Sequence, residues 1–116
     1  MARNVLGRPL LRTKGLRWHQ QFASLLTFQI NDKSEYKKYV EGFFPLLAKH
    51  GGKFLTYDDQ PTVLEGSHEP GRTVMIEFES EEALMTWWNS DEYRALATIR
   101  HASTSTHSVY FLHSAQ

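Results

Sequence analysis

Five side chains in this chain of 116 residues have the chemistry expected of a small-molecule site. An arginine or a tyrosine hydroxyl can polarise a bound substrate in a dry pocket, a carboxylate can act as a base, and aromatic rings can line an apolar cavity. These residue types alone do not identify a catalytic residue. The candidate ligand-binding residues are Tyr39, Glu65, Trp87, Tyr93 and Arg100.

Glu65 is a candidate because Gly66 follows it. A glycine permits close approach of the backbone to a ligand, so the carboxylate is expected at the mouth of a pocket. The structural alternative, which we favour, is that Glu65 pairs with Arg72 or Arg100, while Gly66 makes a bulge or a turn. Arg100 itself is expected to satisfy the last carbonyls of a helix, to neutralise Glu65 or Glu77, or to bind an anion.

The aromatic candidates also have two interpretations. Trp87, Trp88 and Tyr93 could line a pocket between a helix and a sheet, but aromatic residues at helical spacing form the protein core more often. Ser90 lies in no nucleophile motif, and we interpret it as the N-cap of a helix.

Composition disfavours several classes of function. The chain has no cysteine, so it has no disulfide, thiol nucleophile or thiolate metal site, which is compatible with a cytoplasmic location. Its six histidines show no zinc-binding spacing, and its double glycine lacks the other residues of a phosphate-binding loop. We therefore expect neither a metal ion nor a cofactor.

The charges are distributed unevenly along the chain. Residues 1–21 hold five basic residues and no acid, which leaves eight basic residues against 13 acidic ones, a formal charge of −5, in the remainder. An acidic body disfavours nucleic-acid binding, and no apolar run reaches the roughly 18 residues that a membrane span needs. We interpret residues 1–21 as a basic N-terminal arm or tail and residues 22–116 as one domain.

Hydrophobic periodicity predicts four strands and two helical regions. The strands are predicted at residues 22–30, 53–57, 73–79 and 107–113. The first helix follows Asp32 and has an apolar stripe broad enough to cover a sheet, with a kink or early end near residues 41–44 because of Pro45. The second helix follows Ser80, breaks, and restarts at Ser90.

Three connections complete the prediction. Gly51 and Gly52 are expected to supply the left-handed residue that ends the first helix. Residues 62–66 are expected to form a short extended piece, and residues 102–106 a polar link before the last strand.

The element order β-α-β-β-α-β predicts an α+β, ferredoxin-like fold, with a four-stranded antiparallel sheet and the helices on one face. The other face would be a large apolar patch for a monomer, so we predict a homodimer through the open sheet face. Glu77 alternates with the apolar positions of its strand and is expected to face the partner, in a cross-subunit ion pair.

A set of spaced segments and single residues occurs in a fixed order along the chain: residues 39–45, 51–55, 64–66 and 74–78, with Ser80, Ala83, Trp87, Trp88, Ser90, Glu92, Tyr93 and Arg100. This pattern resembles the DUF1330 family over about residues 24–113. The resemblance implies a dimeric α/β barrel like that of small cofactor-independent monooxygenases, and no established reaction. This chain departs from the family at Tyr57, where an arginine is usual, and at His113, where a glycine is common.

The sequence leaves two functions open. One is a homodimeric domain of unknown biochemical function that binds a small apolar or aromatic metabolite. The other is a cofactor-independent monooxygenase-like or isomerase-like enzyme in which Glu65, Tyr39 or Arg100 polarises the substrate. A cavity lined by Trp87 and Tyr93 would favour the enzyme, and a filled interior with Glu65 paired to Arg100 would favour a binding or assembly module.

Overall fold

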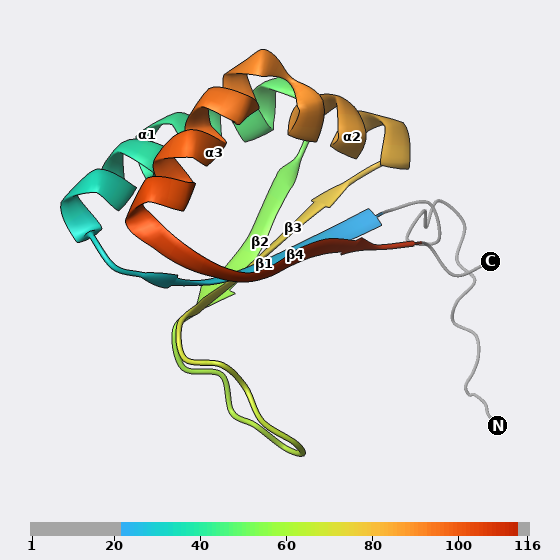
Figure 1. Cartoon of the computed structure of the whole chain (residues 1–116). Helices are drawn as coiled ribbons and strands as arrows, with labels where there is room; N and C mark the ends of the chain where they lie inside the picture. Colours follow the sequence, from blue (N-terminus) through green and yellow to red (C-terminus); the bar gives the residue numbers. More distant parts are fainter. Residues whose placement is uncertain (1–21, 114–116) are drawn as a thin grey trace, which may run out of the picture.

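The computed structural model describes residues 22–113, so the predicted N-terminal arm and residues 114–116 lie outside the described residues. The elements are β1 (Phe22–Ile30), α1 (Lys33–Lys49), β2 (Lys53–Asp58), β3 (Arg72–Phe78), α2 (Glu81–Asn89), α3 (Asp91–Ser103) and β4 (Thr104–Leu112). The strands form one antiparallel sheet in the order β2-β3-β1-β4, and all three helices cover one of its faces (Figure 1). This confirms the predicted ferredoxin-like α+β fold.

Side-chain caps start each helix where the sequence predicted. The Asp32 carboxylate accepts a hydrogen bond of 3.1 Å from the backbone N–H of Glu35 at the start of α1. The hydroxyl groups of Ser80 and Ser90 accept the equivalent bonds in α2 and α3, at 3.0 and 3.1 Å. Each bond satisfies one of the N–H groups that have no partner within the helix.

The predicted early end of the first helix is wrong. α1 passes through Pro45 and ends only at Lys49. A proline inside a helix costs one hydrogen bond and a steric clash. Here Phe43 and Leu47, on either side of the proline, are buried in the core, and the burial of such side chains contributes about 1.5–3 kcal/mol each. That burial offsets the cost of the proline and holds both turns in helical form.

The end of α1 has the predicted glycine cap. Gly51 has a φ of 79°, and its N–H donates to the carbonyl of Ala48 at 3.0 Å. The N–H of Gly52 donates to the carbonyl of Leu47 at 2.9 Å. These two bonds form a Schellman motif, which reverses the chain into β2.

The predicted polar link at residues 102–106 is also wrong, because α3 leads directly into β4. The Ser103 hydroxyl donates to the carbonyl of Ile99 at 2.8 Å, and the Thr104 hydroxyl donates to the carbonyl of Arg100 at 2.6 Å. The Thr104 hydroxyl therefore satisfies one of the last carbonyls of the helix, and the backbone N–H groups of Asn31 and Asp32 donate to another, that of Ser103. No separate linking segment is needed to satisfy them.

A long connection joins β2 to β3. Residues 59–71 contain no strand, and the chain bends at residues 64–66, so the piece predicted at residues 62–66 is not extended throughout. Figure 1 shows that this connection projects beyond the sheet, on the side away from the helices. Leu64, near its middle, is 89% exposed.

The core lies between the helices and the covered face of the sheet. As the alternation predicted, Val74, Ile76 and Phe78 of β3 point into it, beside Leu26 and Phe28 of β1. The helices contribute aromatic and aliphatic side chains to the same cluster: Tyr36, Tyr39, Phe43, Leu46, Leu47, Leu84, Trp87, Tyr93 and Ala97.

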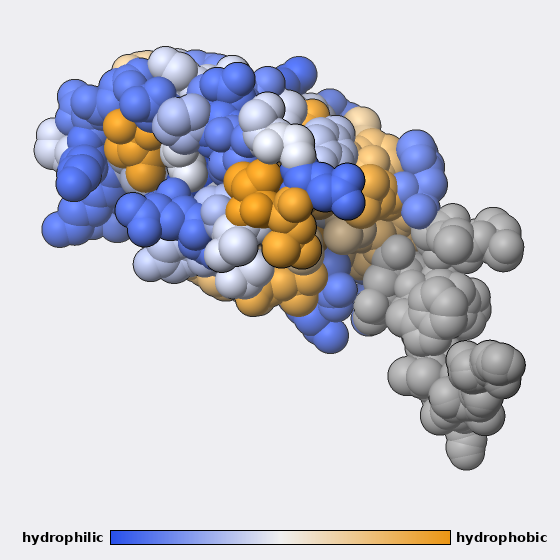
Figure 2. Space-filling model, turned by 90° about the horizontal axis from the view of Figure 1, so that it is seen from below, coloured by the Kyte–Doolittle hydropathy of each residue, from blue (hydrophilic) through white to orange (hydrophobic). Residues whose placement is uncertain are grey.

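The opposite face of the sheet carries a mixed, partly apolar surface. The strand register places Leu25 between Met75 of β3 and Tyr110 of β4, so these three residues form an apolar row across the sheet. Leu112, on the same face of β4, is 52% exposed. Figure 2, which views the molecule from this side, shows hydrophobic patches separated by hydrophilic side chains.

Within residues 22–113, no helix has the length and apolar character that a membrane span requires.

Candidate functional site

A pocket of about 200 Å³ lies between α1 and the sheet. The apolar stripe of α1 forms one wall through Tyr36, Tyr39 and Phe43, and residues of β1, β2 and β3 form the others. Arg72 is the only charged residue among the described residues that line this pocket. The pocket therefore combines an apolar interior with a single guanidinium group.

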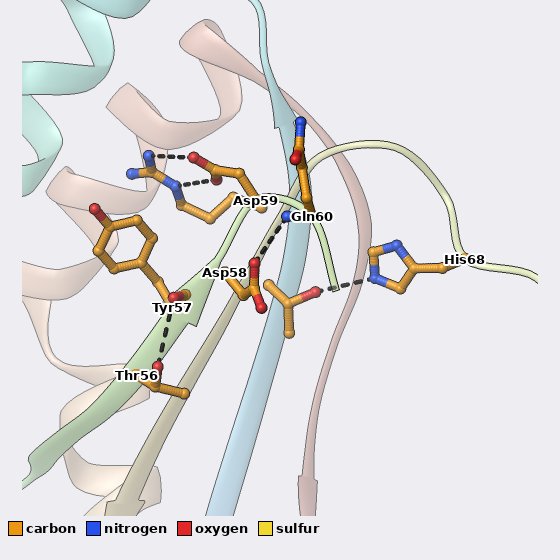
Figure 3. Close-up of polar contacts among 8 residues, drawn as sticks. Thr56, Tyr57, Asp58, Asp59, Gln60 and His68 are labelled. Atoms are coloured by element: carbon orange, nitrogen blue, oxygen red, sulfur yellow. Dashed lines mark hydrogen bonds and ion pairs between the residues drawn. The ribbon is translucent and has the colours of Figure 1, made fainter. Parts of the chain in front are cut away.

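Arg72 is held at the pocket by an acid and two aromatic rings. Its Nε and Nη2 atoms donate to the two carboxylate oxygens of Asp59, at 2.8 and 3.1 Å (Figure 3). Its guanidinium carbon lies 4.4 Å from the ring centroid of Tyr57 and 5.6 Å from that of Tyr36. Such stacking and two-bond pairing suit a planar guanidinium group, and they fix its position.

These contacts change the acidity of the groups involved. The hydrogen bonds from Arg72 lower the pKa of Asp59, and the bonds to Asp59 raise the pKa of Arg72. Burial raises the pKa of Tyr36, an effect that the nearby guanidinium partly offsets. At neutral pH the site therefore contains a carboxylate, a guanidinium cation and a protonated phenol.

Tyr39 and Tyr93 form a buried hydroxyl pair between α1 and α3, with 2.8 Å between their oxygen atoms. Burial raises the pKa of Tyr39 well above its ordinary value, so this phenol stays protonated. One hydroxyl donates to the other, which leaves the proton of the acceptor available to another group. Because Tyr39 also lines the pocket, it is the polar group through which this pair can reach a ligand.

Arg100 is 1% exposed and lies close enough to Tyr39 for its charge to lower the pKa of that phenol slightly. Its Nη1 atom donates to the hydroxyl of Thr106 at 3.0 Å, and its Nε atom has no partner among the described residues. The predicted neutralisation of Glu65 or Glu77 is wrong, since Arg100 forms no ion pair within residues 22–113. Its role as an anion-binding residue stays a prediction.

The structure brings only some of the predicted site residues together. Glu65 is exposed in the connection between β2 and β3, and the predicted pairing with Arg72 is wrong because Asp59 occupies that guanidinium. The rings of Trp87 and Tyr93 pack in the core with centroids 4.2 Å apart, and neither lines the pocket. Of the five candidates, Tyr39 alone lines the pocket.

Sequence reasoning missed Arg72 and Asp59 as site residues. A weak signal was available: Asp59 follows one strand and Arg72 begins the next, so an antiparallel pairing of those strands brings their ends together. Tyr36 lies on the apolar stripe predicted for the first helix, and such a stripe by itself indicates only that its residues face the sheet. Residues 22–113 contain no group of three histidine, aspartate or glutamate residues that could hold a metal ion.

Residues 24–112 match the family described as "Domain of unknown function (DUF1330)". The chain belongs to the DUF1330 family. The resemblance inferred from spaced segments is therefore confirmed. Family membership assigns this domain no reaction, and no curated protein sequence matches it.

Solved structures share the fold of this DUF1330 chain at low sequence identity. A protein of unknown function from Rhodopseudomonas palustris has a TM-score of 0.70 at 15% identity, over 84% of this chain and 85% of that one. SnoaB, a cofactor-independent oxygenase from Streptomyces nogalater, has a TM-score of 0.58 at 14% identity, over 84% and 95%. A dimeric protein of unknown function with a ferredoxin-like fold, from Bacteroides fragilis, has a TM-score of 0.55 at 13% identity, over 80% and 93%.

One departure from the DUF1330 pattern has a structural counterpart. Tyr57 stands near the end of β2, at the position where the resemblance implied an arginine. In this chain Arg72, from the neighbouring strand β3, stacks against the ring of Tyr57. A guanidinium group therefore lies beside Tyr57, although it is carried by β3 and not by β2.

Because their hydroxyls bond to each other, we expect substitutions of Tyr39 and Tyr93 in this DUF1330 domain to have strongly coupled effects on the free energy of unfolding. Either single substitution, Tyr39→Phe or Tyr93→Phe, leaves the other buried hydroxyl without its partner and is expected to cost about 1–3 kcal/mol of unfolding free energy. The double substitution removes both polar groups and is expected to cost less than the sum of the two single effects. Urea unfolding of the four proteins measures this coupling. Additive losses would show that the two hydroxyls do not depend on one another.

Proposed function

We propose that this DUF1330 domain binds a small, largely apolar or aromatic metabolite in the pocket between α1 and the sheet. The observation that carries the proposal is the lining of the pocket, which is aromatic and aliphatic apart from Arg72. Ligand sites typically have this composition, with a few polar groups that orient the ligand. The volume of about 200 Å³ is below the range of about 300–1,000 Å³ typical of drug-sized ligands, which supports a smaller molecule.

Thermal unfolding with indole as a neutral aromatic probe tests this proposal. A ligand that binds only the native state stabilises it, so indole is expected to raise the Tm of the wild type in a concentration-dependent way. Val40→Phe adds a ring at the pocket wall and is expected to abolish the shift. Val63→Phe makes the same change in the exposed β2–β3 connection, outside the pocket, and is expected to keep it. Equal shifts for both variants would place indole binding elsewhere.

A second candidate function is a cofactor-independent, monooxygenase-like or isomerase-like activity. The fold shared with SnoaB supports it only at the level of architecture. Among the described residues that line the pocket, the Arg72 guanidinium and the hydroxyls of Tyr36 and Tyr39 can polarise a substrate. Mass spectrometry of aromatic compounds incubated with the wild type and with Tyr39→Phe distinguishes turnover from simple binding.

We also propose that two copies associate through their open sheet faces, as a dimeric α/β barrel. The apolar row of Leu25, Met75 and Tyr110 supports this arrangement, as does the shared fold of the dimeric Bacteroides fragilis protein. The charged residue Glu77 lies on the same face and remains a candidate for the predicted cross-subunit ion pair.

The lack of cysteine agrees with a proposed cytoplasmic location.

Placing a charge in the centre of the apolar row is expected to separate the two copies. Leu25→Lys would bury an unpaired ammonium group in the interface, and we expect the dissociation constant to rise about 100-fold. Leu64→Lys introduces the same charge at an exposed position of the β2–β3 connection and is expected to leave the dimer intact. Sedimentation velocity at micromolar concentration measures the oligomeric state of the wild type and of both variants. A monomeric wild type would overturn the dimer proposal.

A further inference from the structure

We propose that Arg72 binds the carboxylate group of the pocket's ligand, and that Asp59 is the internal carboxylate with which the ligand exchanges. The ligand would then be a small carboxylic acid with an aromatic or aliphatic body. This inference rests on the proposed function of the pocket and adds the chemical class of the molecule that it binds.

Two aromatic rings hold the guanidinium group of Arg72 in place in addition to Asp59. Its side chain is only 22% exposed, and it lies against the rings of Tyr57 and Tyr36, at 4.4 and 5.6 Å from their centroids. Aromatic contacts of this kind remain when the acid moves away. The cation would therefore keep its position for a second carboxylate.

Asp59 demonstrates how a carboxylate fits this guanidinium. Its two oxygens accept the Nε and Nη2 bonds of Arg72 at 2.8 and 3.1 Å, a two-bond geometry that strongly favours carboxylates over other groups. Yet the Asp59 side chain is 55% exposed and lies at the start of the long β2–β3 connection (Figure 3). Because water reaches the half-exposed Asp59 carboxylate, a ligand carboxylate can compete with it for the same two donors of Arg72.

The guanidinium-bearing residue Arg72 lies at the wall of the apolar pocket. Arg72, Tyr36 and Tyr57 all line the pocket, together with apolar residues such as Phe54 and Val74. A carboxylate bound at Arg72 would therefore direct the rest of a small molecule into the apolar interior. The Tyr36 phenol, which burial keeps protonated, supplies a second donor at the same end.

Phenylacetate and phenylacetamide test this inference because they have nearly the same shape and differ in charge. Isothermal titration at low ionic strength is expected to show about tenfold tighter binding of the acid to the wild type, since salt screens partly exposed charges. Arg72→Met is expected to remove that preference and to retain binding of the amide. Asp59→Asn removes the competing carboxylate, and is expected to tighten binding of the acid several-fold without changing that of the amide.

Asp58→Asn is the matched control for Asp59→Asn. The Asp58 carboxylate accepts from the N–H of Gln60 at 2.8 Å and makes no ion pair within residues 22–113, so neither affinity is expected to change. Equal binding of acid and amide to the wild type would overturn the inference and leave the proposed pocket function intact. Failure of both probes to bind would overturn both. If Arg72→Met does not fold, the Asp59→Asn variant tests the inference alone. An affinity of that variant for phenylacetate equal to that of the wild type would overturn the inference.

Discussion

Replacing Trp87 by alanine is expected to lower the free energy of unfolding by about 3–5 kcal/mol, because it removes a fully buried indole ring from the core. The ring packs against Tyr93 and Phe78, with centroids 4.2 and 5.5 Å away, so its loss opens a cavity between α2, α3 and β3. Urea unfolding measures the change. The protein concentration must be held constant, since the proposed association of two copies would make the apparent stability depend on it.

Trp87→Phe separates the packing of this residue from its polar atom. The indole Nε1 has no hydrogen-bond partner among the described residues, so phenylalanine forfeits no bond and is expected to cost much less than alanine. Trp88→Ala, at a half-buried position of the same helix, is the control for a general effect on α2. Equal losses for Trp87→Ala and Trp88→Ala would contradict the central place of Trp87 in the core.

Gly71→Ala is expected to cost about 3 kcal/mol, through backbone strain and a steric collision. Gly71 has a φ of 134°, a conformation that residues with a side chain rarely adopt, and a Cβ atom there would collide with the backbone carbonyl oxygen of Phe28. Because Arg72 follows directly, any shift of the backbone also moves the guanidinium group of the candidate site. Chemical unfolding is expected to show the loss of stability, and a lower affinity for phenylacetate is expected to show the displacement of Arg72.

Gly66→Ala is the matched comparison within the same connection. Gly66 also has a positive φ, of 83°, but an added Cβ would meet no atom within 4 Å. Only the cost of the left-handed conformation remains, about 1–2 kcal/mol. If both variants lose the same stability, the close approach of Gly71 to β1 contributes nothing, and our explanation for Gly71 is wrong.

Short-range patterns predicted the parts of the fold that depend on neighbouring residues. The caps at Asp32, Ser80 and Ser90 each use a bond to an N–H three residues further along the chain. The alternation of residues 73–79 likewise identified the buried side of β3. The errors at Pro45 and at residues 102–106 arose where core packing, or hydroxyl groups near the helix end, outweighed a local rule.

The candidate site depends on contacts that no local pattern contains. Asp59 and Glu65 are two acids of one connection, and only the pairing of β2 with β3 selects Asp59 as the partner of Arg72. The hydroxyls of Tyr39 and Tyr93 meet across 54 positions of sequence. Spacing alone cannot distinguish a pocket wall from a filled core, because that depends on how every neighbouring side chain packs.

The sequence by itself determined the strand and helix order, the helix starts, the apolar faces and the membership of the DUF1330 family. The elements and their faces follow from hydrogen bonds and periodicities that span a few residues. Family membership follows from spaced segments that can be recognised directly in the amino-acid sequence. Only the tertiary structure decided which aromatic residues fill the core, which line the pocket, and which acid neutralises the cation beside it. Those outcomes depend on distances between strands and helices, which the chain acquires only when it folds.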